Sequence, residues 1–388
     1  MSPDVVIVGG GVIGLAIAWR TAQAQLSVAV VDKEPGQGAS YAAAGMLAPV
    51  TEVHYGEEAL LGLNLASARL YPAFVEELEA ATGMTVGFRS SGTLFVAADD
   101  DDAAAIDDLF RFQRELGLPV QRIRRRQCRA LEPLLAPRVR SGIVAGGDHQ
   151  VDSRRLVDAL LAVSGQLGVT VHRQHAASLR LDGNRAVGVT LADGEVLDAA
   201  LVVLAAGCWS GGLPGVPPES RASVRPVKGQ ILRLRGSGDP PLLTRTVRGL
   251  VHGASVYLVP RVDGEVIVGA TVEERGFDST VTAGAVYELL RDAAEIVPGV
   301  SELEMVEARA GLRPGSPDNA PLLGSTAVDG LVIATGHFRN GILLTPVTAI
   351  AVAELLVTGR APELIAPFSP LRFASERSPS DPVESAVP

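Results

Sequence analysis

Two residues in the second half of the chain have the chemistry needed to hold a small carboxylate. Arg313 in "AGLRPGSPD" follows a predicted strand and precedes a Gly/Pro loop, and its guanidinium can grip a carboxylate through two parallel hydrogen bonds. Tyr257 in "SVYLVPR" lies on a predicted strand, from which its hydroxyl could share that carboxylate. The alternatives are a surface or ion-paired arginine and an ordinary strand aromatic.

A third candidate, Arg339, lies in "GHFRNGILLTP", between a predicted strand and a helix that we expect to open near Gly341. A positive charge there opposes the positive end of the helix macrodipole, so we expect an anion to offset it. That anion is either a bound ligand or a carboxylate in a local salt bridge. His337, in the same turn, is expected to pack rather than to act as a base.

The N-terminal stretch "VVIVGGGVIGLAIAW" has the fingerprint of a dinucleotide site. Gly9, Gly11 and Gly14 form G-x-G-x-x-G between a predicted strand and a predicted helix, so the backbone can approach a pyrophosphate at the helix N-terminus. Asp32 ends the next strand, 18 residues after Gly14, where a carboxylate can accept hydrogen bonds from ribose hydroxyls. The motif alone does not decide between NAD and FAD.

Two further segments favour FAD. "YAAAGMLAP", residues 41–49, is a small-residue turn soon after the acidic strand, where backbone atoms can pack against a flat ring. "VVLAAGCWSGGL", residues 202–213, is a second apolar strand whose Ala-Ala-Gly end can lie beside the pyrophosphate. We therefore predict FAD bound across a parallel sheet.

Composition limits the possible partners. The net charge of −10 argues against nucleic acid or an anionic membrane as the main partner. Cys128 and Cys208 form neither a disulfide framework nor a metal-ligand pattern, so we expect no metal and a reducing compartment. The N-terminal apolar run has no basic segment before it, and no other run reaches the roughly 18 apolar residues of a membrane span. We expect a cytoplasmic protein with a small-molecule partner.

The predicted fold class is α/β, with a Rossmann-like FAD-binding domain interleaved in sequence with a mostly antiparallel β-sheet domain that binds substrate. The main predicted elements are strands at 4–8 and 27–32, helices at 12–24 and 57–82, and a last strand and helix within 331–357. The basic segment 122–127 is expected to be a solvated turn. The predicted ranges are 1–82, 142–220 and 308–373 for the FAD-binding domain, 83–141 and 221–307 for the substrate domain, and 374–388 for a disordered tail.

The ordered set of motifs resembles the glycine oxidase branch of the D-amino acid oxidase family of flavoproteins. The resemblance covers residues 4 to 373 and is carried by "GGGVIG", "AAAGML", "RPVKGQ", "YLVPR", "VGAT", "GLRPGSPDNAPLLG" and "GHFRNGILLTP". It implies a substrate-domain sheet that roofs the flavin, and often a homotetramer. Relatives with covalent flavin attach it through a cysteine late in the chain, and none follows Cys208, so the FAD is expected to be noncovalent.

The resemblance also implies roles for individual residues. It places the substrate carboxylate at Arg313, with Tyr257, Arg339 and Met46 in the same region, although Met46 could instead fill a gap in the core. The residues implied to contact FAD are Gly9, Gly11, Val12, Ile13, Gly14, Asp32, Lys33, Ser40, Ala44, Gly45, Met46, Ala177, Gly207, His337, Phe338, Arg339, Asn340, Gly341, Ile342 and Leu343.

The implied reaction is the oxidative deamination of a small amine, and no catalytic side chain is expected beyond the flavin. A neutral amine held by its carboxylate would pass hydride from Cα to flavin N5, and hydrolysis of the imine would release a 2-oxo acid and ammonia. Molecular oxygen would then take the electrons and give hydrogen peroxide. The resemblance further implies a role in making the thiazole of thiamine.

Two departures from the family leave the substrate open. Ser255 stands where a histidine is frequent, and Val272 where a methionine is common, and both positions would line the pocket. Glycine, sarcosine and small D-amino acids therefore remain alternatives, as does a dehydrogenase that passes electrons to a carrier. A noncatalytic flavin-binding homologue is a third class, against which the joint presence of Arg313, Tyr257 and Arg339 argues.

Overall fold

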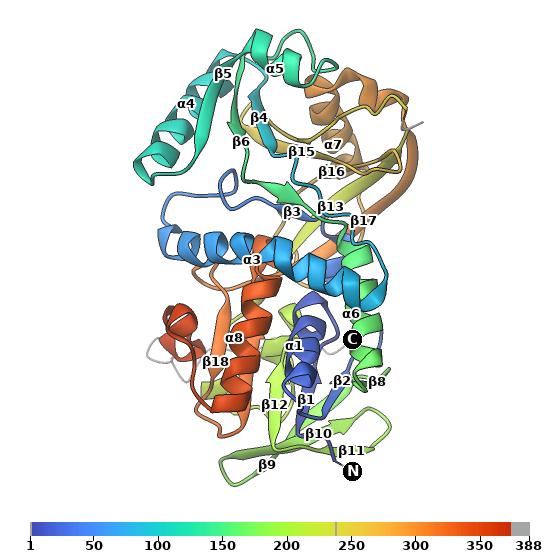
Figure 1. The fold of residues 1–388 in the computed structure, drawn as a ribbon, viewed down its shortest axis with the longest axis vertical. Coiled ribbons are helices and arrows are strands. Elements are labelled where there is room, and N and C mark those ends of the chain that lie inside the picture. The colour runs from blue at the N-terminus through green and yellow to red at the C-terminus, as the bar shows by residue number, and fades with distance from the viewer. Residues whose placement is uncertain (1, 237–238, 374–388) are drawn as a thin grey trace.

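The computed structural model describes residues 2–236 and 239–373 of the chain. In this part, two large sheets form the two ends of an elongated molecule, with the long helix α3 (Glu58–Thr82) lying between them (Figure 1). The predicted tail, 374–388, lies outside the described residues. The predicted α/β class with a second, mostly antiparallel sheet is confirmed.

The first sheet is parallel except at one edge. In spatial order its strands are β18 (Leu322–Ser325), β19 (Leu331–Thr335), β12 (Leu201–Leu204), β1 (Val5–Val8), β2 (Val28–Val31) and β8 (Thr170–His172). Strands β12, β1 and β2 are buried apolar runs, as expected for a sheet covered on both faces. From β1 the chain proceeds to β2 on one side and later to β12 on the other. A crevice at such a switch point is where open α/β sheets bind ligands.

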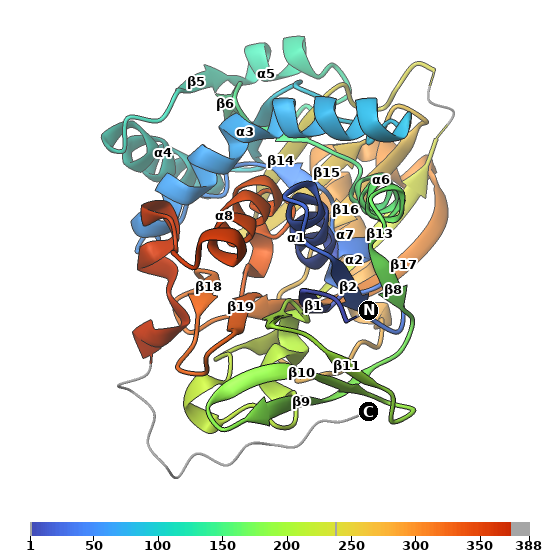
Figure 2. The same ribbon diagram turned by 60° about the horizontal axis from the view of Figure 1, so that its bottom comes forward.

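Helices cover one face of this sheet, and a small antiparallel sheet covers the other (Figure 2). The helices on the first face are α1 (Val12–Gln23), α8 (Thr345–Thr358) and, packed against α1, α6 (Ser153–Gln166). The strands on the second face are β9 (Ala176–Asp182), β10 (Arg185–Leu191) and β11 (Val196–Asp198). Helix α3 crosses α1 and α6 and ends at Gly83, whose φ of 69° suits glycine.

The second sheet has eight strands in the described residues, and all but one of its pairings are antiparallel. In order they are β17 (Glu304–Gly315), β13 (Arg225–Arg235), β16 (Glu265–Gly269), β15 (Ala254–Pro260), β14 (Thr246–Val251), β4 (Thr93–Ala97), β6 (Ser141–Ala145) and β5 (Val120–Arg124). Its outer face packs on α7 (Ala283–Ile296), and α4 (Asp100–Glu115) covers its far end. Its inner face turns toward the first sheet. Strands β6 and β17 cross two of the predicted boundaries, at 141/142 and 307/308, and the division into domains remains our prediction.

Most of the predicted elements are confirmed within a residue or two, and two differ. The basic segment 122–127 is not a turn, because it completes β5 and begins helix α5 (Arg125–Leu131). The last helix does not open near Gly341: a short 3-10 turn, Phe338–Asn340, comes first, and α8 begins at Thr345. Pro346 in its first turn suits a helix start, because proline has no backbone N–H to leave unpaired there.

The remaining short elements connect these layers. They are α2 (Ala39–Ala42), the two-stranded pair β3 (Met46–Leu47) and β7 (His149–Gln150), and 3-10 turns at Gly207–Gly212, Pro218–Ser220, Pro298–Glu302, Glu363–Phe368 and Pro370–Phe373. None of the helices within residues 2–236 and 239–373 combines the length and the hydropathy that a bilayer crossing requires.

Candidate active site

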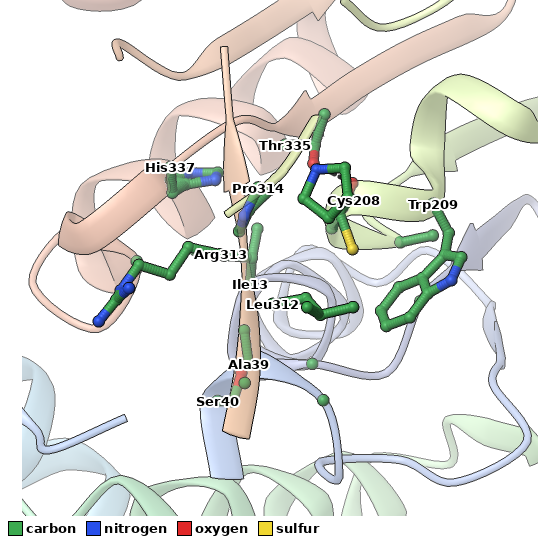
Figure 3. A pocket seen from close by; sticks show the side chains of 18 of the residues that line it. Ile13, Ala39, Ser40, Cys208, Trp209, Leu312, Arg313, Pro314, Thr335 and His337 are labelled. Carbon is green, nitrogen blue, oxygen red and sulfur yellow. Dashed lines mark hydrogen bonds between the residues drawn. The ribbon is translucent and has the colours of Figure 1, made fainter. Parts of the chain in front are cut away.

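A single cavity of about 1910 Å³ extends from the carboxyl ends of β1, β2 and β12 to the inner face of the eight-stranded sheet. Pockets for drug-sized ligands usually measure roughly 300–1,000 Å³, so this cavity can hold a much larger molecule. Cys208 and Trp209 lie on one side of it, and Arg313 and His337 on the other (Figure 3). We call the part beneath the eight-stranded sheet, lined by Glu52, Arg248, Tyr257, Arg313 and Arg339, the chamber.

The glycine motif after β1 is shaped as a dinucleotide cradle. Gly9 has a φ of +111°, and a Cβ there would lie 2.4 Å from the carbonyl oxygen of Ala205. A Cβ on Gly14 would lie 1.9 Å from the carbonyl oxygen of Gly9. Only glycine therefore allows the loop and α1 to pack this closely against the strands, which leaves the N-terminus of α1 open toward the cavity.

Asp32 fixes the second part of the cradle. Its Oδ2 accepts a hydrogen bond of 2.6 Å from the N–H of Gly10, and its Oδ1 one of 2.8 Å from the N–H of Glu34. Each carboxylate oxygen can accept more than one hydrogen bond, so Asp32 retains capacity for ribose hydroxyls. The hydroxyl of Ser40 accepts from the N–H of Val12, the first residue of α1. These contacts fit a bound dinucleotide.

The structure brings together nearly all the residues that the sequence suggested for FAD. Those that line the cavity are Gly9, Gly11, Val12, Ile13, Asp32, Lys33, Ser40, Ala44, Gly45, Met46, Ala177, Gly207, His337, Phe338, Arg339, Asn340, Gly341 and Ile342. Gly14 and Leu343 do not. Gly14 acts through its close contact with Gly9, and Leu343 packs in the hydrophobic cluster around α1, α3 and α6. A contact between Leu343 and the cofactor would be through its backbone.

A buried arginine that the sequence reading missed supports the turn before Met46. A Cβ on Gly45 would lie 1.9 Å from the carbonyl oxygen of Val151, so the turn sits directly on the segment that precedes α6. Arg261 donates to the carbonyl oxygen of Ala44 at 2.6 Å and to that of Val151 at 2.9 Å. Arg261 therefore ties the turn to the eight-stranded sheet. Nothing in the stretch "YLVPR" indicates this role, because a single arginine there forms no recognisable pattern.

Helix α3 holds the loop that precedes α8. The Ser67 hydroxyl donates to the carbonyl oxygen of Leu343 at 2.6 Å, and the Tyr71 hydroxyl donates to that of Ile342 at 3.1 Å. These two bonds reach carbonyl groups that precede the helix start, where the regular helical hydrogen bonds have not yet begun. They keep this loop in place along the cavity.

Arg313 and Tyr257 meet in the chamber. The pKa of Tyr257 is raised to about 12, mainly by burial, while the positive charge of the neighbouring Arg313 acts in the opposite direction. The Tyr257 hydroxyl therefore stays protonated and can donate. One Nη of Arg313 donates to the carbonyl oxygen of Thr271 at 3.1 Å, which orients the guanidinium along the sheet. Arginine and tyrosine thus present donors to one small region, as the sequence predicted.

Gly229 on β13 makes room for this arrangement. A Cβ there would lie 2.2 Å from one Nη of Arg313, so the guanidinium lies directly over the glycine. We expect Gly229→Ala to fold, because the far end of a flexible side chain can move, but to displace the guanidinium and raise the KM for the substrate roughly tenfold or more. Steady-state kinetics test this, with Gly284→Ala as control, since Gly284 lies in α7 on the outer face of the same sheet and a Cβ there would have no neighbour within 4 Å. An unchanged KM for Gly229→Ala would contradict this role.

The sequence left open what offsets the charge of Arg339, and the structure answers it. Arg339 forms an ion pair with Glu57, and its Nε lies 3.9 Å from an oxygen of Glu52. The local salt bridge is therefore present. Neither carboxylate was singled out from the sequence, because Glu52 lies in an irregular segment and Glu57 lies at the first position of the predicted helix, and no motif marks either residue.

His337 does not have the properties of a base. It is 3% exposed, its Nε2 lies 3.1 Å from the Thr348 hydroxyl, and burial lowers its pKa to about 3. It is neutral at physiological pH, which agrees with the expected packing role. Ser255 and Val272, the two departures from the family, both line the cavity, and Val272 is 70% exposed.

The low pKa of His337 gives a prediction about acid stability. The unfolded state protonates His337 below about pH 6.5 and the folded state only near pH 3, so between these values the unfolded state binds more protons and stability falls as pH falls. As the pH falls from 6 to 4.5, we expect the free energy of unfolding to decrease in both proteins. For each pH unit, the decrease in His337→Asn should be roughly 1 kcal/mol smaller than in the wild type. Urea unfolding across this range measures the difference. Parallel pH profiles for the two proteins would show that His337 titrates normally when folded.

Both cysteines are buried thiols. Burial raises the pKa of Cys128 to about 11 and that of Cys208 to about 12, so neither is a reactive thiolate. Cys208 lines the cavity without a cysteine partner in the described residues.

These features define a class: a protein that holds a dinucleotide cofactor across a parallel sheet and has a chamber for a small ligand under a second sheet. A family model described as FAD dependent oxidoreductase (DAO) matches residues 4–355. The chain belongs to this family, and its cofactor is FAD.

Similar known proteins agree with this assignment. The chain is 37% identical over 373 residues to the glycine oxidase of Geobacillus kaustophilus, an alignment that covers 94% of this chain and 96% of that protein. It is 36% identical to the bifunctional protein ThiO/ThiG of Synechocystis sp., over 99% of this chain but only 56% of that protein. The crystal structure of glycine oxidase from Geobacillus kaustophilus superposes with a TM-score of 0.87 at 35% identity, covering 95% of this chain and 98% of that one.

Proposed function

We propose that the protein oxidises glycine to glyoxylate and ammonia, with oxygen as the electron acceptor and hydrogen peroxide as the second product. The observation that carries the proposal is that Arg313 has no acidic partner among the described residues. Its guanidinium lines the chamber, and among the described residues no carboxylate lies within ion-pair distance of it, whereas Arg248 and Arg339 are both paired. An unpaired, half-buried guanidinium in the chamber is a site for a substrate carboxylate.

The roles of the other residues in the cavity follow from the binding of the substrate carboxylate by Arg313. Arg313 and the protonated Tyr257 hydroxyl would hold the carboxylate, which fixes the adjacent Cα and nitrogen relative to the cradle. Bound FAD would supply the redox chemistry by accepting a hydride from the substrate Cα. Positioning would therefore do most of the work, because His337 is neutral and hydrogen-bonded and offers no base. Met46, which also lines the cavity, would limit the size of the substrate.

Sarcosine and small D-amino acids are the second candidates. Ser255 is a small side chain, and Val272 is 70% exposed, so the cavity wall at these two positions leaves space beyond a glycine. A panel of glycine, sarcosine and D-alanine, compared by kcat/KM, decides among them.

The test of the function uses the visible spectrum of the purified holoprotein. Glycine added without oxygen is expected to bleach the flavin absorbance, and air is expected to restore it with release of hydrogen peroxide. Slow recovery in air would identify a dehydrogenase with another acceptor. Failure of every small amine to bleach the flavin would contradict the chamber as the substrate site.

The cellular setting of the enzyme belongs to the same proposal. We propose a cytoplasmic homo-oligomer, a tetramer by resemblance, that supplies the imine of glycine for the thiazole of thiamine. The match to the ThiO/ThiG protein supports this pathway. The mass of the protein in solution tests the tetramer, and thiamine auxotrophy of a deletion strain tests the pathway.

A further inference from the structure

A buried carboxylate, Glu52, lies among the arginines of the chamber. One of its oxygens is 3.0 Å from an Nη of Arg248, and the other is 3.9 Å from the Nε of Arg339. Arg248 on β14 is the cross-strand partner of Tyr257 on β15, so the two side chains project from the same face of the sheet. Because Tyr257 also contacts Arg313, a continuous row leads from the substrate anchor to Glu52.

The position of Glu52 is fixed by its neighbours. Asp148 accepts hydrogen bonds from the backbone N–H groups of Val50 and Thr51, at 3.0 and 2.9 Å. Arg248 donates to the carbonyl oxygen of Thr51 as well as pairing with Glu52. The backbone before Glu52 is thus held by Asp148 and Arg248, and the ion pair with Arg248 keeps the Glu52 carboxylate in the chamber.

Glu52 is ionised. Burial opposes its ionisation, but Arg248 and Arg339 hold the pKa of Glu52 below its usual value. Glu57 supplies a second negative charge beside Arg339. Of the three guanidinium groups of the chamber, those of Arg248 and Arg339 are balanced by Glu52 and Glu57, which leaves Arg313 for the carboxylate of the substrate.

Two donors near Glu52 have unused hydrogen-bonding capacity. The Nε atoms of Arg248 and Arg339 are buried, and among the residues that the structure describes neither has a hydrogen-bond acceptor. Both arginines line the cavity. Without the charge of Glu52, these two groups would form a second place for an anion near the first.

We propose that Glu52 restricts the chamber to substrates with a single carboxylate, because its own carboxylate occupies the place beside Arg248 and Arg339 that a second one would need. This inference rests on the proposed function, since it assumes that Arg313 receives the first carboxylate. Glu52 is thereby a specificity-determining residue. A dicarboxylate ligand is excluded by like-charge repulsion and by the lack of a free guanidinium.

The test compares acetate and malonate as ligands of the FAD-loaded protein, with binding followed through the flavin absorbance. We expect malonate to bind the wild type at least about tenfold more weakly than acetate. In Glu52→Gln, we expect the Kd for malonate to fall at least about tenfold, while that for acetate changes less than about threefold. Equal binding of both ligands to the wild type, or an equal change for both in Glu52→Gln, would overturn the proposal.

Three further variants keep the test decisive. Glu52→Asp retains the charge and should keep the preference for acetate. Glu52→Gln/Arg248→Met removes both partners of the buried ion pair, so it leaves no unpaired Arg248 and serves in place of Glu52→Gln if that variant fails to fold. The double variant should gain no affinity for malonate, and a gain there would contradict the role of Arg248. Glu77→Gln removes a distant ion pair with Arg20, 2.6 Å long, and serves as the control.

Failure of this inference can be told apart from failure of the proposed function. Binding of acetate and malonate requires no turnover, so a wild type that prefers acetate but does not oxidise glycine would contradict only the proposed reaction. A wild type that oxidises glycine but binds malonate as well as acetate would contradict only the role of Glu52.

Discussion

Arg313→Ala is expected to lower kcat/KM for glycine roughly 100- to 1,000-fold while the protein still binds FAD. Removing one partner of a buried, hydrogen-bonded charge pair costs about 2–5 kcal/mol, and about 1.4 kcal/mol corresponds to a factor of ten. The loss should appear mainly as a higher KM, because the carboxylate is bound in the ground state as well as in the transition state. Steady-state kinetics with peroxide detection measure it, and the flavin spectrum reports that the cofactor site is intact.

A neighbouring arginine on the same strand is the matched control. Arg309 on β17 lies near Glu307 and does not line the cavity, so Arg309→Ala should change KM less than about threefold. Arg313→Lys separates charge from geometry, because an ammonium group cannot form two parallel bonds to a carboxylate. We expect Arg313→Lys to recover only part of the lost kcat/KM. Wild-type kinetics in Arg313→Ala would remove this residue from the substrate site.

Gly14→Ala is expected to have the largest effect on the cofactor. The added methyl would lie 1.9 Å from the carbonyl oxygen of Gly9, a backbone atom that cannot move without shifting the loop after β1. We expect the variant to be purified without FAD and to lose roughly 2–4 kcal/mol in its free energy of unfolding, as for an overpacked core position. Absorbance at the flavin bands and urea unfolding of the apoproteins give the two measurements.

The control for this variant is a glycine in an open position. Gly62 lies on the exposed side of α3, and a Cβ there would have no neighbour within 4 Å. Gly62→Ala should keep FAD, and its free energy of unfolding should rise by up to about 1 kcal/mol, because alanine favours the helix over the unfolded chain. Retention of FAD by Gly14→Ala at wild-type stability would show that the loop tolerates a side chain.

The cofactor cradle and the chamber differ in how well the sequence predicts their residues. The cofactor cradle could be predicted because its parts are local: Gly9, Gly11 and Gly14 occur in one short stretch, and the strand and helix around them have clear apolar patterns. Tyr257 and Arg313 could be proposed because each lies in a motif of its own. The start of α8 was misplaced because no residue in the stretch after His337 is a strong helix signal before Thr345 and Pro346.

The sequence by itself determined the fold class and the dinucleotide cradle, since both depend on residue types at short, regular spacing, and its resemblance to a known family indicated the candidate carboxylate anchor. Only the tertiary structure decided the partners of the anchor. Arg248 meets the loop before α3 across 197 residues of sequence, and Gly229 lies under Arg313 because β13 and β17 pair in one particular register. Pairing register and loop position depend on the packing of the whole chain, so no local pattern carries them. The charge balance around Glu52 is therefore a property of the folded molecule.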